Sequence, residues 1–283
     1  MNAAVETLID LALAEDIGAG DVTAEFFIPP ERQAAAFITA RADGTLSGTE
    51  VAARVFAKVD ESLDVKVLLP AGSRISAGAV LLKITGSARS IVTAERTALN
   101  FLQRLSGVAT ITAQFADAVM GTGARVLDTR KTTPGFRILE KQAVLHGGGT
   151  NHRMGLFDRA MVKDNHLVVE GGAEALQAAI DALKARNDAI AVELEADDLQ
   201  QVAGFLKLRG VDFILLDNMD NEMLREAVAM RDGRPRPLLE ASGGVTLETI
   251  RGIAETGVDF ISVGALTHSA PALDIGMDFQ LTP

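Results

Sequence analysis

The chain has 283 residues, of which 48% are hydrophobic, and a formal net charge of −11. This composition supports a buried core in one large or two ordinary domains, and the acidic excess argues against a nucleic-acid or anionic-membrane partner. The absence of cysteine excludes disulfides, thiolate metal sites and cysteine nucleophiles. The first residues lack the basic region of a signal peptide, and no apolar run is long enough to span a bilayer, so we expect a cytoplasmic protein.

The first hundred residues change from a helical to a strand-like pattern and back. Apolar residues at helical spacing predict a helix over residues 5–13, ended by the glycine-rich stretch 17–20. From about residue 21 to residue 86, short alternating segments broken by glycine and proline predict a small β-rich domain. The helical period returns over 90–119, and we expect this helix to bridge two domains. The candidate strands of the β-rich domain are 36–40, 65–69 and 80–84.

Beyond residue 123, short apolar runs alternate with amphipathic stretches, a pattern typical of βα units around a parallel sheet. Helical stripes cover 176–183 and 224–228. Polar or small residues follow each apolar run, which favours a closed or nearly closed βα barrel over an open doubly wound sheet. Six strands are clear, so a full eightfold barrel is not established. These strands are 125–127, 160–162, 190–194, 213–216, 238–240 and 260–263.

Between Arg125 and His166 the acidic chain reverses its charge. This stretch holds eight basic and four acidic residues, a net charge of +4, together with three of the four histidines. A local cationic segment in an anionic protein is most simply a site for a small, highly charged anion. Four of its cations are expected to be ordinary surface charge: Arg125, Arg137, Lys141 and Arg159.

The candidates for anion capture are Arg130, Lys131, Arg153 and Lys163, because arginine offers a planar fork to a carboxylate or phosphate and lysine a point charge. His152 is able to donate to the same anions, as is His268. A metal site at these histidines is discounted, since the neighbouring lysines and arginines repel a cation and no pair of histidines has ligand spacing.

The last two strand ends carry small residues, 242–244 and 263–265. Barrels often bind phosphate after their final strands, where backbone N–H groups without bulky neighbours approach the anion closely. Thr246 is expected to cap a helix whose positive end assists. The alternative is that both are tight turns that simply require glycine.

Glu195 and Asp217 end neighbouring strands, so their carboxylates are placed to share one magnesium ion or to hold sugar hydroxyls. The alternative is an acidic rim that only offsets the cations. Glu193 has the same strand parity as Glu195, and spacing alone leaves open which of the two faces the site.

Three segments, LDTRKTTPG (127–135), GGGTNHR (147–153) and VKDNH (162–166), carry a resemblance to a known family. Together with supporting blocks in the same order, they resemble quinolinate phosphoribosyltransferase, also called nicotinate-nucleotide pyrophosphorylase (carboxylating). The similarity spans nearly the whole chain. The supporting blocks are 94–100, 215–218, 240–244 and 262–269.

The resemblance implies an α/β protein with an N-terminal α/β sandwich domain and an open βα barrel. We place the first domain at 1–105, the barrel at 106–270, and a C-terminal tail at 271–283 that packs back on the first domain. The resemblance also implies a homodimer with an active site shared between subunits, magnesium (Mg²⁺) as cofactor, and quinolinate and phosphoribosyl pyrophosphate as substrates.

By the same resemblance, Lys131, Glu195 and Asp217 are the catalytic residues, and Glu195 and Asp217 also hold the metal. Glu195 is preferred over Glu193 because its place relative to Asp217 fits the family better. Arg96 is expected to reach in from the partner subunit. The full set of expected substrate-binding residues is Arg96, Thr129, Arg130, Lys131, His152, Arg153, Lys163, Glu195, Asp217, Ser242, Gly243, Gly244, Val263, Gly264, Ala265 and His268.

The implied reaction transfers the phosphoribosyl group to the quinolinate nitrogen with decarboxylation, giving nicotinate mononucleotide, pyrophosphate and CO₂, a step of NAD biosynthesis. Two alternatives stay open from sequence. One is a paralogue of the same fold acting on another anion, as in the group associated with molybdenum transport. The other is a non-catalytic anion-binding protein, which retention of Lys131 and the acidic pair disfavours.

Overall fold

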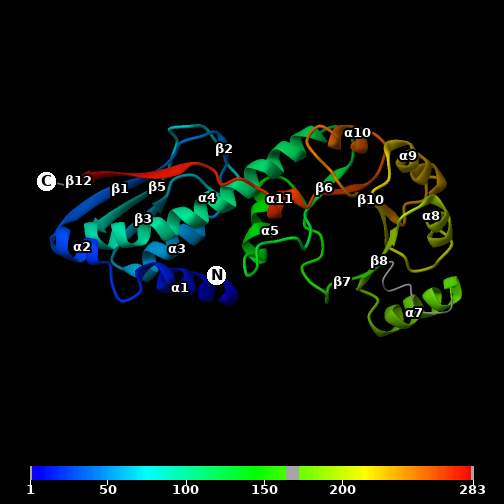
Figure 1. Ribbon diagram of the computed structural model, residues 1–283, viewed down its shortest axis with the longest axis horizontal. Helices are drawn as coiled ribbons and strands as arrows, with labels where there is room; N and C mark the ends of the chain where they lie inside the picture. The colour runs from blue at the N-terminus through cyan, green and yellow to red at the C-terminus, as the bar shows by residue number, and fades with distance from the viewer. Residues whose placement is uncertain (1, 164–171, 282–283) are drawn as a thin grey trace. The chain divides into compact units, whose positions relative to one another are not determined.

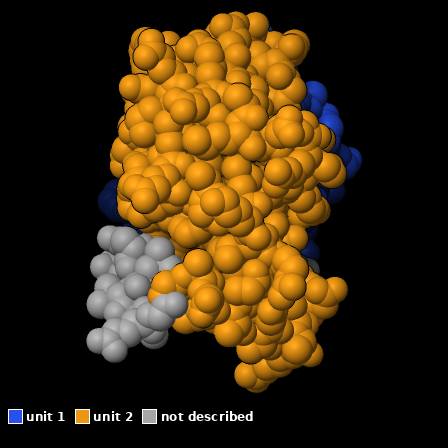
Figure 2. Space-filling model, turned by 90° about the vertical axis from the view of Figure 1, so that its right-hand side faces the viewer, with its two compact units in different colours: residues 1–113, 132–148, 266–283 blue, residues 114–131, 149–265 orange. Residues whose placement is uncertain are grey.

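The structure is a computed structural model that describes residues 2–163 and 172–281. Its contacts divide the chain into two compact units, coloured separately in Figure 2. Unit 1 comprises residues 1–113, 132–148 and 266–283, and unit 2 comprises residues 114–131 and 149–265. The units therefore interleave along the chain instead of dividing it at one point. Among the described helices, none combines the length and apolar character that a membrane crossing requires.

Unit 1 is built on an antiparallel sheet with strand order β12-β1-β5-β3. The strands are β1 (Gln33–Ala40), β3 (Asp64–Val67), β5 (Val80–Ser87) and β12 (Ile275–Leu281). Alternate residues of β1 are fully buried because only one face of the sheet meets the core. The tail expected to pack on the N-terminal domain thus supplies an edge strand, with Ala34 opposite Leu281.

Helices accompany this sheet in Figure 1. α3 (Thr49–Val59) packs against β3, and α1 (Ala3–Ile17) packs against α3. α1 buries Val5, Ile9 and Leu13 at the predicted spacing. The long helix α4 (Ala88–Ala118) matches the second predicted helix, and its residues are divided between the two units. The remaining elements of unit 1 are α2 (Val22–Phe27), β2 (Gly44–Thr45), β4 (Arg74–Ile75), α5 (Arg137–His146) and α11 (Ala265–His268), whose first residue belongs to unit 2.

Unit 2 is built on a six-stranded sheet with order β6-β11-β10-β9-β8-β7, in which every pairing is parallel. The edges of this sheet are β6 and β7, so among the described residues the barrel is open, as predicted. The six predicted strands are confirmed within two residues at each end. They are β6 (Arg125–Leu127), β7 (Arg159–Val162), β8 (Ala191–Ala196), β9 (Phe213–Asp217), β10 (Leu238–Ser242) and β11 (Phe260–Ser262).

Helices follow the strands of unit 2, as the predicted stripes required. α7 (Gly172–Arg186) buries Ile180, and α9 (Asn221–Met230) buries Leu224 and Ala227. One expectation is wrong: Thr246 does not cap a helix, because the following helix begins at Ile250 and its N-cap is Thr249. Thr246 instead begins a turn, in which its carbonyl accepts from the Thr249 and Ile250 amides. The helices are α7 (Gly172–Arg186), α8 (Leu199–Phe205), α9 (Asn221–Met230) and α10 (Ile250–Ala254).

Candidate active site

A cavity of about 490 Å³ lies at the carboxyl ends of the parallel strands of unit 2. Parallel strands present their carboxyl ends to one edge of a sheet, so the residues that follow them converge there. The cavity brings together eleven of the predicted site residues, which come from the ends of five strands and from the segment before β7. These residues are Thr129, Arg130, Lys131, His152, Arg153, Lys163, Glu195, Asp217, Ser242, Gly243 and Gly244.

Five predicted site residues do not line this cavity. Val263, Gly264 and Ala265 directly follow β11, whose last residue Ser262 does line it. Arg96 and His268 are exposed and belong to unit 1. Residues 164–166 of the third family segment lie outside the described residues.

Two arginines dominate the charge of the cavity. Burial lowers the pKa of the Arg153 guanidinium, and the neighbouring Arg130 lowers it further because like charges repel. The Arg153 side chain donates to the carbonyl of Arg159 at 3.4 Å and to the Met161 sulfur at 3.3 Å, neither of which carries negative charge. The carboxylates of Glu193 and Asp158 offset only part of the lowering of the Arg153 pKa, so this part of the cavity favours an anion.

The two carboxylates of the cavity have different partners. Glu195 forms an ion pair with Lys163, and its side chain is only 10% exposed. Asp217 accepts from the side-chain amide of Asn218 at 2.7 Å. Glu193 and Glu195 both point to the same face of β8, but only Glu195 lines the cavity, which settles the question that spacing left open. Glu193 is fully buried.

Gly243 is required by the local backbone. Its φ is +105°, and a Cβ built on it would lie 2.1 Å from Oδ1 of Asn218. No side chain fits at that distance, so the close approach of the β9 and β10 ends depends on glycine. The turn after β10 therefore needs glycine for its shape, whatever ligand it binds.

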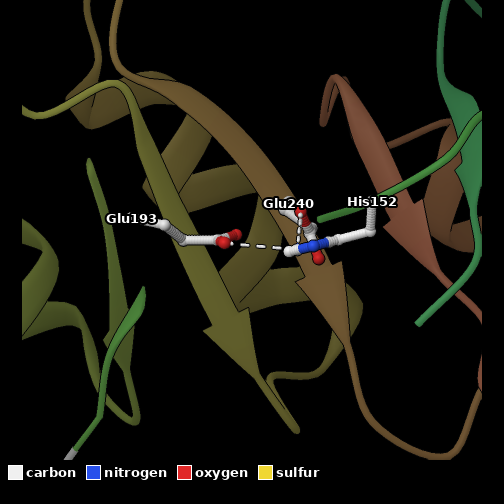
Figure 3. A group of neighbouring side chains, drawn as sticks. All are labelled: His152, Glu193 and Glu240. Atoms are coloured by element: carbon white, nitrogen blue, oxygen red, sulfur yellow. Dashed lines mark ion pairs between the residues drawn. The ribbon is translucent and has the colours of Figure 1, made fainter. Parts of the chain in front are cut away.

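At the floor of the cavity lies a group of polar side chains that we call the buried cluster: His152, Arg159, Glu193, Glu240 and Ser262. Of these, His152, Glu240 and Ser262 also line the cavity. Glu193 and Glu240 point toward the His152 ring from two strands of the sheet (Figure 3). The His152 Nε2 lies 3.2 Å from Oε2 of Glu193 and 3.4 Å from Oε2 of Glu240. Ser262 donates to Oε1 of Glu240 at 2.5 Å.

The buried cluster changes the protonation of its members. Burial alone lowers the pKa of His152, but its hydrogen bonds to Glu193 and Glu240 outweigh this effect and raise the pKa to about 9. In the neutral ring Nδ1 accepts from the Arg153 amide at 2.6 Å, and protonation of Nδ1 would break this bond. Burial and the charge of Glu193 raise the pKa of Glu240, so the two carboxyls resist ionising together.

Sequence reasoning missed several residues here. Arg159 is not ordinary surface charge: its Nη1 lies 3.4 Å from Glu193 Oε2, and its guanidinium stacks on Phe213 with 4.1 Å to the ring centroid. The prediction that Lys141 is ordinary surface charge is also wrong, since this residue is 1% exposed. The sequence did contain a signal for Glu240. It precedes the predicted site residue Ser242 by two positions, so both side chains lie on the same face of β10.

The fold and the cavity together define an α/β protein in which an open parallel barrel carries an anion-binding site at its strand ends. Sequence comparison with protein families is consistent with this class. Residues 21–106 match the N-terminal domain of quinolinate phosphoribosyl transferase, and residues 108–278 match its C-terminal domain. The chain belongs to the quinolinate phosphoribosyltransferase family.

Individual relatives span nearly the whole chain. It is 44% identical to a chloroplastic nicotinate-nucleotide pyrophosphorylase [carboxylating] of Arabidopsis thaliana, with 96% of this chain and 82% of the relative covered. It is 42% identical to the carboxylating enzyme of Mycobacterium leprae, with 97% of each covered. A solved nicotinate-nucleotide pyrophosphorylase from Francisella tularensis superposes with a TM-score of 0.91 at 37% identity, covering 99% of this chain and 97% of the other.

Proposed function

We propose that this protein transfers the phosphoribosyl group of phosphoribosyl pyrophosphate to the nitrogen of quinolinate with loss of CO₂, giving nicotinate mononucleotide and pyrophosphate. The observation that carries the proposal is the pair Arg130 and Arg153 in one cavity, where burial and mutual repulsion lower the pKa of Arg153. A dicarboxylate relieves this repulsion. The relatives that carry the carboxylating name support the same reaction over the two alternatives considered from sequence.

Quinolinate carries two adjacent carboxylates, and the cavity offers several cations to hold them. Arg130 and Arg153 have the planar donors that match carboxylate oxygens, and Lys163 adds a point charge. His152 contributes differently, because both of its ring nitrogens face protein atoms. Its part is to shape the cavity floor and, when protonated, to add positive charge.

Attack of the pyridine nitrogen on the ribose carbon displaces pyrophosphate. Positive charge develops on the sugar and negative charge on the leaving group, so fixed cations near the pyrophosphate stabilise the transition state. Lys131 has this role, with Thr129 beside it accepting from the Lys131 amide at 3.0 Å. No general base is required, because the attacking nitrogen has no proton to lose. The phosphate is assigned to residues 242–244 and 263–265 and to His268.

Magnesium fits the donor set that the cavity provides. Glu195 and Asp217 supply two carboxylates on neighbouring strands, and magnesium commonly uses one or two protein carboxylates while substrate phosphates complete its shell. Bound there, the ion supplies charge neutralisation for the pyrophosphate and orients it. Lys163 forms an ion pair with Glu195, so a metal ion held by Glu195 would compete with this lysine for the carboxylate.

Decarboxylation follows alkylation of the ring nitrogen. The pyridinium ring accepts the electron pair of the breaking carbon–carbon bond, CO₂ leaves, and the ring carbon takes up a proton. Arg130 and Arg153 hold the remaining carboxylate and keep the ring in place during this step.

We also propose that the protein is a homodimer whose active site includes Arg96 of the partner subunit. Arg96 is exposed on α4, so its side chain is accessible to a partner subunit. Arg96→Ala and Lys163→Ala proteins, each nearly inactive, should recover part of their activity after subunit exchange. Mixed dimers without any recovery would count against the shared site.

The decisive experiment mixes the protein, magnesium, phosphoribosyl pyrophosphate and quinolinate and follows nicotinate mononucleotide by chromatography, with nicotinate as a parallel substrate. Product is expected from quinolinate and not from nicotinate, and chelation of magnesium should abolish turnover. Absence of product from quinolinate would overturn the proposal. Equal use of nicotinate would overturn recognition of two carboxylates, and binding of quinolinate without turnover would favour a non-catalytic protein.

A further inference from the structure

The buried cluster draws its side chains from four strands of one sheet. Arg159 lies on β7, Glu193 on β8, Glu240 on β10 and Ser262 on β11. Both glutamates are 0% exposed, and the side chain of His152 is 5% exposed. Burying two carboxylates carries a large desolvation penalty unless partners compensate them. Hydrophobic residues of similar volume would fill this part of the core without the desolvation penalty.

The cluster is not arranged as a metal site, although one ligand atom from each of His152, Glu193 and Glu240 lies within 4.8 Å of the others. The Nη1 of Arg159 lies 3.4 Å from Glu193, 3.9 Å from Glu240 and 3.4 Å from the His152 Nε2. A guanidinium thus already stands where a cation would bind. The Nε2 also carries a hydrogen whenever Nδ1 accepts one, so it has no lone pair for a metal.

The imidazole of His152 links the two glutamates of the cluster to the backbone of Arg153. Its Nε2 faces the two carboxylates, and its Nδ1 accepts from the backbone N–H of Arg153 at 2.6 Å. The backbone N–H of His152 donates to the buried Asp128 at 2.8 Å. The ring and the backbone at residues 152 and 153 are therefore fixed from three directions. The direction in which the Arg153 side chain leaves the backbone depends on these bonds.

We propose that Glu240, together with Glu193, is a positioning residue for substrate binding: it fixes the His152 ring, and the ring fixes the backbone from which Arg153 reaches the cavity. This inference rests on the proposed function, which assigns Arg153 to the dicarboxylate. Neither glutamate needs to touch substrate. A displacement of the Arg153 guanidinium of about 1 Å is enough to weaken carboxylate binding by an order of magnitude or more.

The test compares Glu240→Ala with Glu240→Gln, which keeps an acceptor for the ring and the partner for Ser262 while removing the charge. Glu240→Ala should raise the KM for quinolinate about tenfold, with kcat and the KM for phosphoribosyl pyrophosphate changed far less, because only Arg153 is displaced. Glu240→Gln should restore much of the loss. The matched control is Glu226→Ala, an exposed glutamate on α9 in the same unit.

A second readout does not depend on turnover. The chain has four histidines, so ring ¹⁵N spectra are simple, and the missing signal of a His152→Asn protein identifies His152. The wild-type ring should show hydrogen on Nε2, and its shifts should move in Glu240→Ala and less in Glu240→Gln. Unchanged His152 shifts in both variants would overturn the inference, as would an equal rise of both KM values or stoichiometric zinc binding at His152.

Failure of this inference and failure of the proposed function give different results. If the wild-type protein makes no nicotinate mononucleotide, the proposed function is wrong, and the ring spectra still test whether Glu240 positions His152. Unchanged His152 shifts with normal turnover remove the inference alone. If Glu240→Ala fails to fold, Glu240→Gln and its spectra still decide the question.

Discussion

The buried cluster and the arginine pair of the cavity, Arg130 with Arg153, hold their charges in different surroundings. In the cluster, Glu193 has Arg159 and His152 within 3.4 Å, so the chain itself balances the charges it buries. In the cavity, burial lowers the pKa of Arg153, and the like charge of the neighbouring Arg130 lowers it further. The cluster holds cations beside its carboxylates, although Oε1 of Glu193 and Oε2 of Glu240 have no hydrogen-bond partner, whereas the arginine pair gains stability when an anion enters.

This difference indicates which charges serve folding and which serve binding. Removing a member of the buried cluster leaves an uncompensated charge in the interior, so stability should fall. Removing a cation of the cavity relieves repulsion, so stability should hold or rise while ligand binding is lost. Each of the following substitutions tests one side of this contrast.

The largest expected effect comes from Arg153→Ala. Loss of a charge-assisted contact to a carboxylate should lower kcat/KM for quinolinate about 10²- to 10³-fold, whereas the melting temperature should stay the same or increase. Steady-state kinetics and thermal unfolding measure the two quantities, with Arg225→Ala on the exposed side of α9 as control. A large fall in melting temperature would place Arg153 among the residues that serve folding.

A smaller effect concerns pH and the buried cluster. The pKa of His152 is raised to about 9, above its ordinary value of 6.5. A raised pKa contributes stability that is fully present below pH 6.5 and is lost as pH rises toward 9. The free energy of unfolding should therefore fall over that interval by at most about 3 kcal/mol relative to a His152→Gln protein, measured by urea unfolding. Parallel curves for the two proteins would contradict the raised pKa.

The smallest effect is expected for Arg159→Lys. Lysine keeps the charge near Glu193 but loses the planar stacking on Phe213, so stability should fall by about 1 kcal/mol. Urea unfolding at neutral pH measures this, with Arg209→Lys on the surface as control. A loss of the size expected for an unpaired buried charge would show that lysine does not reach Glu193.

The sequence predicted the parallel sheet well because hydrophobic runs and the residues after them carry local information. β6 and β7 end where the predicted runs end, at Leu127 and Val162, and eleven predicted residues meet in one cavity. The sequence-based prediction failed where the environment of a side chain depends on residues distant in the chain. The sequence pattern around Arg159 predicts surface charge, and only its distance from Glu193 shows otherwise. Lys141 lies in a helix whose buried face also includes charged residues.

The role of Glu240 shows the same limit more sharply. Strand parity placed it on the face of Ser242, but only the three-dimensional structure brings the His152 ring within 3.4 Å. Glu193 and Glu195 share parity too, and depth in the sheet separates their environments. Periodicity reports the face of a strand and not the level at which a side chain lies.

The order in which the chain is synthesised gives the strand topology a consequence for folding. β1 pairs with β12, and β6 pairs with β11, so each sheet joins an early strand to one near the C-terminus. Such distant pairings make folding slow, because long loops must close before the contacts form. During synthesis on the ribosome, β1 lacks its β12 partner and β6 lacks its β11 partner until those later strands have been made. Shortening the C-terminus by the length of β12 should therefore yield a chain that aggregates during expression.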